Sequence, residues 1–158
     1  MKKPTYKIKN VDQMEPFLMS LTSSDNHWMF ISSNGALTAG REKADCALFP
    51  YVTDNLIHNS LNTTGPKTKI EIYKKDTKID TWSPLSYLPP KHLVDKNLYK
   101  DALGDNILYE EINKDLNITF RYQWLTSKEF GFIKKTELIN DSSREIRVRV
   151  VDGIQNIL

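Results

Sequence analysis

Five residues in the first third of the chain combine the two side-chain types that a sugar-binding surface uses. They are Trp28, Arg41, Asp45, Tyr51 and Asp54. Aromatic rings stack on the C–H face of a sugar, whereas guanidinium and carboxylate groups hydrogen-bond to its hydroxyls. These five are therefore our candidate carbohydrate-binding residues. A purely structural interpretation stays open, in which Trp28 and Tyr51 fill the core, Arg41 pairs with Asp45, and Asp54 ends a turn.

Carboxylates are the groups that glycoside cleavage requires, one as an acid and another as a base or nucleophile. Asp45 and Asp54 are separated by a loop that contains Pro50, and the sequence does not show them facing each other. Glu110 and Glu111 are adjacent on an expected strand, so they point to opposite faces and cannot form a catalytic pair. We interpret all four as surface carboxylates and expect no catalytic residue in this chain.

Histidine and cysteine residues give no sign of a metal site. His27, His58 and His92 lack the spacing of metal ligands, and the single cysteine, Cys46, excludes both an internal disulfide and a zinc site built from cysteine pairs. We expect neither a metal nor a cofactor.

Length and charge exclude several classes of protein. The 158 residues have the size of one domain, and 22 basic against 20 acidic residues give a net charge of +2. This charge is too weak for binding driven by the phosphates of nucleic acid or by anionic lipid. The longest apolar runs are too short to span a membrane, and Met1 is not followed by a signal peptide. We expect a cytoplasmic protein that binds neither nucleic acid nor membrane.

The alternation of apolar and polar residues is clearest in the last third of the chain. Within residues 117–124, four apolar side chains point one way and polar ones the other, which predicts a strand with one buried face. Further strands are expected at 108–113, 130–139 and 144–151, the last with Ile146, Val148 and Val150 inward. Four consecutive antiparallel strands form a meander, whose apolar face requires a second layer. We therefore predict a mainly β fold for residues 1–158, an antiparallel sandwich with at most one or two short helices.

The first two thirds of the chain give weaker signals. Residues 11–21 are compatible with a short helix, although Pro16 interrupts it. Residues 84–106 are rich in proline and polar residues, which predicts a long surface excursion with a helical turn within 95–103. Further strands are expected at 28–31, which reads as a buried strand, at 36–38 after a tight turn, and at 67–73 and 79–83.

Several segments together resemble a known domain. The closing segment 130–153 has an aromatic residue, a strand that ends in Leu138-Ile139-Asn140, a polar turn and a second strand. The hairpin 109–124 and the early residues 25–28, 34–35, 40–41, 45 and 48–51 fit the same pattern. These segments resemble the N-terminal β-supersandwich domain of bacterial carbohydrate-active enzymes that carry a six-fold α/α barrel, such as the cellobiose phosphorylase-like and glucoamylase-like groups. The resemblance covers about half of the chain.

The resemblance implies a function in a larger protein. The catalytic carboxylates of those enzymes lie in the barrel, which would follow Leu158, and the sequence ends within an expected strand. We therefore expect a truncated chain: the non-catalytic N-terminal accessory domain of a glycoside hydrolase or glycoside phosphorylase, packed against its catalytic domain. The alternative is a free-standing module that binds carbohydrate or another protein. Because the meander leaves an apolar face to cover, a homodimer of the chain is a further expectation.

Overall fold

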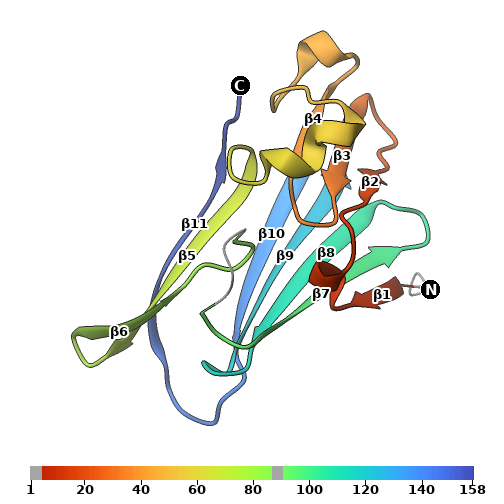
Figure 1. The fold of residues 1–158 in the computed structure, drawn as a ribbon. Coiled ribbons are helices and arrows are strands. Elements are labelled where there is room, and N and C mark those ends of the chain that lie inside the picture. Colours follow the sequence, from red (N-terminus) through yellow and green to blue (C-terminus); the bar gives the residue numbers. More distant parts are fainter. Residues whose placement is uncertain (1–4, 87–90) are drawn as a thin grey trace.

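The computed structural model describes residues 5–86 and 91–158, which form an antiparallel β-sandwich (Figure 1). The predicted fold class is confirmed. The elements along the described chain are β1 (Thr5–Lys9), η1 (Val11–Gln13), β2 (Leu18–Leu21), β3 (His27–Ser32), β4 (Leu37–Arg41), η2 (Ala44–Cys46), η3 (Asp54–Ser60), β5 (Gly65–Lys74), β6 (Thr77–Trp82), β7 (Val94–Asp101), β8 (Asn106–Asn113), β9 (Ile118–Ser127), β10 (Gly131–Asn140) and β11 (Arg147–Gln155), where η marks a 3-10 helix.

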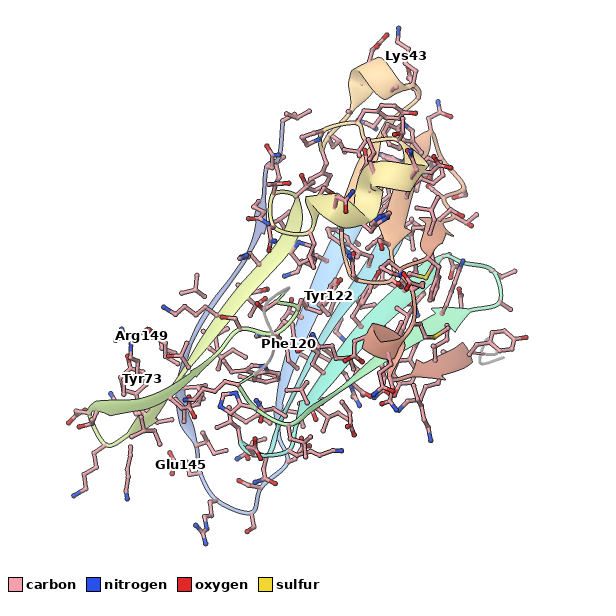
Figure 2. All side chains as sticks on the ribbon, viewed as in Figure 1. Lys43, Tyr73, Phe120, Tyr122, Glu145 and Arg149 are labelled. Atoms are coloured by element: carbon pink, nitrogen blue, oxygen red, sulfur yellow. The ribbon has the colours of Figure 1, made fainter. Side chains whose placement is uncertain are left out.

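One layer of the sandwich is a five-stranded sheet with the order β1-β7-β8-β9-β10. Its centre is the β8–β9 hairpin, in which Tyr109 lies opposite Tyr122. The alternation predicted for β9 is confirmed, because its four inward side chains are at most 2% exposed: Ile118, Phe120, Tyr122 and Trp124. Figure 2 shows Phe120 and Tyr122 in the space between the layers.

Two three-stranded sheets together form the second layer, with the orders β2-β3-β4 and β11-β5-β6. Ile31 and Leu37 of the first sheet and Ile70 of the second are fully buried in one core cluster with β9. The Trp82 ring meets the Phe120 ring edge to face, with centroids 6.5 Å apart. The inner face of the five-stranded sheet is therefore covered by strands of the same chain.

The strand predicted at 144–151 exists, but its predicted partner is wrong. β11 does not continue the meander beside β10; it crosses to the other layer and pairs with β5 from Arg147 to Gln155. The side chain of Asn140 holds the loop, donating to the Arg144 carbonyl at 2.7 Å and accepting from the Ser142 amide at 3.0 Å. These bonds lie within residues 140–144, before β11 begins at Arg147. Val150, predicted inward, is 41% exposed.

The predicted helical turn within 95–103 is also wrong, because β7 occupies this region. Leu98 on β7 is fully buried, so the segment is part of the sheet and not a surface excursion. Its neighbours Lys96 and Asn97 are polar, yet they bind carboxylates of β8. This pairing of polar side chains hides the apolar alternation by which a strand is recognised.

Residues 11–21 do not form the short helix that was expected. Val11–Gln13 is a single 3-10 turn and Leu18–Leu21 is strand β2, with Pro16 between them. Proline has no N–H to donate, so the chain leaves the helical conformation there. The turn at 33–35 is confirmed; its Gly35 has a φ of +97°, and a Cβ at this position would lie 2.8 Å from the Tyr122 hydroxyl.

Within the described chain, no helix has both the length and the apolar character that a membrane-spanning helix needs.

Candidate functional site

Three aromatic side chains gather on the outward face of the β2-β3-β4 sheet. The Trp28 ring lies 6.0 Å from the Tyr51 ring, edge to face, and 6.1 Å from the Phe30 ring. Tyr51 is 56% exposed and Phe30 is 39% exposed, while Trp28 is half-buried between them. We call Trp28, Phe30 and Tyr51 the aromatic patch.

The two strands beneath the aromatic patch fix the Trp28 ring. Trp28 on β3 is the register partner of Gly40 on β4. A Cβ at Gly40 would lie 2.5 Å from Cζ2 of Trp28 and 2.8 Å from the Cys46 carbonyl oxygen, so only glycine leaves room for the indole. The φ of Gly40 is not in the left-handed region, and its function is therefore steric.

Tyr51 is held beside Trp28 by the segment that precedes it. The amides of Leu48 and Phe49 both donate to the Ala39 carbonyl, at 2.8 and 3.1 Å. The Thr38 hydroxyl donates to the Pro50 carbonyl at 2.9 Å. The loop that carries Tyr51 is thus bonded to β4 along its length, which presents the ring from a fixed position.

The structure does not bring the other three predicted residues into the aromatic patch. Arg41 follows Gly40 on β4, so its side chain points to the opposite face of the sheet from the aromatic patch. There it lines a cavity of about 360 Å³ together with His27. Asp45 is exposed in η2 and forms its ion pair with Lys43 at 3.8 Å, not with Arg41 as the structural interpretation had it. Asp54 is exposed at the start of η3, where its Oδ1 accepts from the Asn55 amide at 2.9 Å.

Phe30 belongs to the aromatic patch, yet sequence reasoning did not select it. The segment 28–31 was interpreted as a buried strand, but only Met29 and Ile31 are buried, with exposed fractions of 1% and 0%. Strand alternation places Phe30 on the same outward face as Trp28. This period-two signal was present in the sequence and was obscured because all four residues are apolar.

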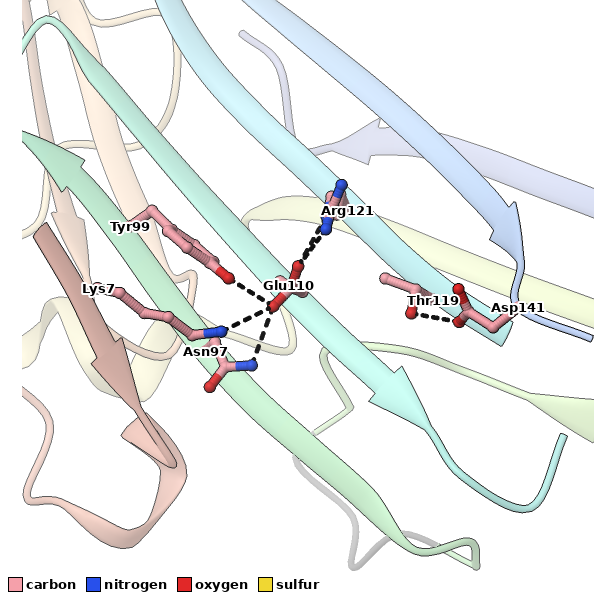
Figure 3. A network of polar contacts seen from close by, with 7 residues as sticks. All are labelled: Lys7, Asn97, Tyr99, Glu110, Thr119, Arg121 and Asp141. Carbon is pink, nitrogen blue, oxygen red and sulfur yellow. Dashed lines mark hydrogen bonds and ion pairs between the residues drawn. The ribbon is translucent and has the colours of Figure 1, made fainter. Parts of the chain in front are cut away.

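The carboxylates Glu110 and Glu111 point to opposite faces of β8, as predicted, but they are not surface groups. Their exposed fractions are only 2% and 3%. Glu110 lies on the outer face of the five-stranded sheet, under the side chains of β1, β7 and β9 (Figure 3). Glu111 lies on the inner face.

Every oxygen of Glu110 has partners (Figure 3). Oε2 accepts from Arg121, with Nε at 2.8 Å and Nη2 at 2.6 Å, while Oε1 accepts from the Tyr99 hydroxyl at 2.8 Å and the Asn97 amide at 3.0 Å. Lys7 adds a longer contact of 3.5 Å. Burial alone would raise the pKa of this carboxyl, but the donors outweigh burial and hold the pKa below its ordinary value. A carboxylate bound on both oxygens is structural rather than catalytic.

Glu111 has fewer partners than Glu110. Its Oε1 accepts from the Leu85 amide at 2.8 Å and faces Lys96 at 3.2 Å. Burial is the main cause that raises the pKa of Glu111, and the charge of Asp12 acts in the same direction. Glu111 is therefore a buried carboxyl whose proton affinity is increased.

Among residues 5–86 and 91–158, no three histidine, cysteine or acidic side chains are grouped so that they could hold a metal ion. Comparison of the sequence with protein-family models finds no match, and neither does comparison with curated proteins.

Proposed function

We propose that this chain is a non-catalytic β-sandwich module that binds carbohydrate through the aromatic patch, as the accessory domain of a glycoside hydrolase or glycoside phosphorylase. The observation that carries the proposal is the exposure of Phe30 and Tyr51 on either side of Trp28. Soluble proteins seldom place three aromatic rings together at the surface without a ligand or partner to cover them.

The geometry of the aromatic patch suits sugar rings. The Tyr51 ring stands at 80° to the Trp28 ring, whereas Phe30 is tilted by 36° to it. The three rings thus offer faces in different directions, and the C–H face of a pyranose packs on such a ring while its hydroxyls stay in water. Trp28 and Phe30 lie on β3, and the loop that carries Tyr51 is hydrogen-bonded to β4. The patch therefore needs little ordering when a ligand binds, which lowers the entropic cost of binding.

The link to a catalytic domain is supported by the resemblance of the hairpin 109–124, the closing segment 130–153 and short segments within the first 51 residues to supersandwich domains. Glu110 is committed to Arg121 and Tyr99 and is not available for chemistry. In this proposal the acid and base for glycoside cleavage come from the catalytic domain, and the module supplies binding.

Intrinsic fluorescence tests the proposal directly. The chain has three tryptophans, and Trp82 and Trp124 are only 4% and 1% exposed, so a ligand at the surface reports through Trp28. We expect at least one member of a panel of soluble α- and β-glucans and their oligosaccharides to change the emission. Tyr51→Ala should weaken that binding about two- to tenfold, because one aromatic contact contributes about 0.5–1.5 kcal/mol.

Tyr6→Ala is the matched control, since Tyr6 is 65% exposed on β1 of the other layer. It should leave the affinity for the glycan unchanged. Binding that survives Tyr51→Ala undiminished, or a panel in which no glycan changes the emission, would contradict the proposal. Turnover of aryl-glycosides by the purified chain would contradict the non-catalytic part of it.

Protein contact is a second candidate function, favoured by a different surface. Val151 on the edge strand β11 is 65% exposed, and Ile157 and Leu158, which follow the end of this strand, are 61% and 71% exposed. An edge strand with apolar side chains is suited to pair with another chain or domain. We expect light scattering to show self-association of the purified chain, and Val151→Lys to reduce it; a monomer mass for the unaltered chain would remove the homodimer as an explanation for this surface.

A further inference from the structure

A cleft opens between the inner face of the five-stranded sheet and the segment around η1, on a different part of the molecule from the aromatic patch. Its volume is about 330 Å³, within the range of small-molecule sites. We call it the inner cleft. It is lined by Val11, Asp12, Met14, Pro16, Ser33, Asn34, Leu61, Leu85, Ser86, Lys96, Asn97, Tyr109, Glu110 and Glu111.

The walls of the inner cleft are mainly apolar. Val11 and Leu61 are buried, with exposed fractions of 7% and 9%, and Pro16 and Leu85 complete this surface. Met14 at the mouth is 49% exposed. An apolar wall of this kind binds the hydrocarbon or aromatic part of a ligand, because removing apolar surface from water is favourable in free energy.

Acidic side chains predominate among the ionisable groups described in the inner cleft. Glu111 contacts Lys96, the one cation among the described lining residues, and Asp12 lines the same cavity. The side chain of Glu110 lies on the other face of the sheet and is paired there with Arg121. Tyr109 is neutral, because burial raises the pKa of its hydroxyl far above the neutral range. Among the described lining residues of this face, acidic side chains therefore outnumber cations.

Glu111 also keeps one oxygen available. The Leu85 amide and Lys96 both contact Oε1, so Oε2 has no partner among the described residues. Asp12 is exposed and likewise makes no hydrogen bond or ion pair within the described chain. A carboxylate whose contacts are on one oxygen can accept a further donor on the other, and a cationic donor forms the stronger bond.

We propose that the inner cleft binds a small molecule that joins an apolar body to an amine or other cationic group. The body packs against Val11, Leu61 and Leu85, and the cation is placed between Asp12 and Oε2 of Glu111. Two donors of an ammonium group then bind the two carboxylates. This site is independent of the carbohydrate function proposed above.

Three probes with the same apolar body and different charge test the proposal: 2-phenylethylamine, 2-phenylethanol and 3-phenylpropionate. Titration of the ¹⁵N-labelled chain should shift the amides of Leu85, Lys96 and Glu111, and the amine should bind more tightly than the alcohol and the alcohol more tightly than the acid. Asp12→Asn should weaken amine binding about two- to fivefold and leave alcohol binding unchanged. Because Asp12 is exposed, this variant is expected to fold normally.

Asp45→Asn is the matched control, since Asp45 is an exposed acid of another 3-10 helix and lies outside the inner cleft. It should not change the affinity for the amine. Equal binding of the three probes, preference for the acid, shifts confined to other surfaces, or an amine affinity that survives Asp12→Asn would each overturn the proposal. None of these outcomes bears on glycan binding at Tyr51, so the two sites fail or succeed separately.

Discussion

Glu110 and Glu111 are neighbours on β8 with nearly equal burial, yet their environments have opposite effects. Glu110 has donors on both oxygens from three strands, and its pKa is lowered. Glu111 has one lysine and one backbone amide on a single oxygen, and its pKa is raised. Burial costs both carboxylates their hydration; the number of donors decides whether the pKa falls, as for Glu110, or rises, as for Glu111.

The two glutamates also differ in how they link pH to stability. For Glu110, whose pKa is lowered on folding, the stabilisation is present above the ordinary glutamate pKa and is lost as pH falls through the folded value. For Glu111, whose pKa is raised, the contribution is present below the ordinary pKa and is lost as pH rises through the folded value. One strand therefore carries two carboxyl groups whose contributions to the free energy of unfolding change in opposite directions as the pH rises.

Glu110→Gln should have the largest effect of the variants that separate the two sites. The amide keeps the shape but removes the charge that Arg121 and Tyr99 bind, and hydrogen bonds to charged groups are the stronger kind. We expect a loss of about 2–3 kcal/mol in the free energy of unfolding at neutral pH, measured by urea denaturation. The loss should shrink as pH falls below the ordinary glutamate pKa.

Glu145→Gln controls for the removal of a negative charge, because Glu145 is exposed in the loop between β10 and β11 (Figure 2). It should change the free energy of unfolding by less than about 0.5 kcal/mol. If Glu110→Gln were equally mild, the network in Figure 3 would contribute little to stability and the contrast between the two glutamates would disappear.

Glu111→Gln should have a smaller effect with the opposite pH dependence. The amide oxygen still accepts from the Leu85 amide, and the variant avoids a buried charge that has one oxygen without a partner. We expect a change of about 1 kcal/mol or less at neutral pH. The stability of the variant relative to the unaltered chain should rise with pH, whereas that of Glu110→Gln should fall; parallel pH profiles would show that our assignment of the two shifts is wrong.

Lys7→Met should have the smallest effect. Lys7 reaches Glu110 only at 3.5 Å and is itself 35% exposed, and an exposed ion pair contributes about 0–1 kcal/mol. The methionine keeps the apolar stem over the Tyr99 ring. Urea denaturation should detect less than about 0.5 kcal/mol, and a loss as large as that of Glu110→Gln would make β1 a main support of the network.

Residues of β8 and β9 show how far the sequence predicts this fold. Alternation along β9 identified its buried face, and adjacency alone placed Glu110 and Glu111 on opposite faces. Their burial was not predictable, because the partners Lys7, Asn97 and Arg121 come from three other strands that only the tertiary structure assembles. The same pairing concealed β7, whose polar side chains look like those of a loop.

Only part of the candidate site was predicted, because its residues too are brought together by the tertiary structure. Trp28 and Tyr51 are 23 positions apart, and their residue type was a sufficient signal to select both. Arg41 was selected because of its residue type. Strand alternation, however, points its side chain away from the face on which Trp28 packs over Gly40. Whether residues from separate loops share a face depends on turns and crossings, which composition does not specify.

The pairing of β5 with β11 has a consequence for how the chain folds. It joins residues 65–74 to residues 147–155, and Asp152 then links Thr68 to Lys134 of the opposite layer at 2.6 and 2.7 Å. Contacts between such distant segments form slowly, since a long loop must close before they contribute. During synthesis the β5–β6 hairpin emerges long before β11, and its edge strand stays open to other chains until the second layer closes.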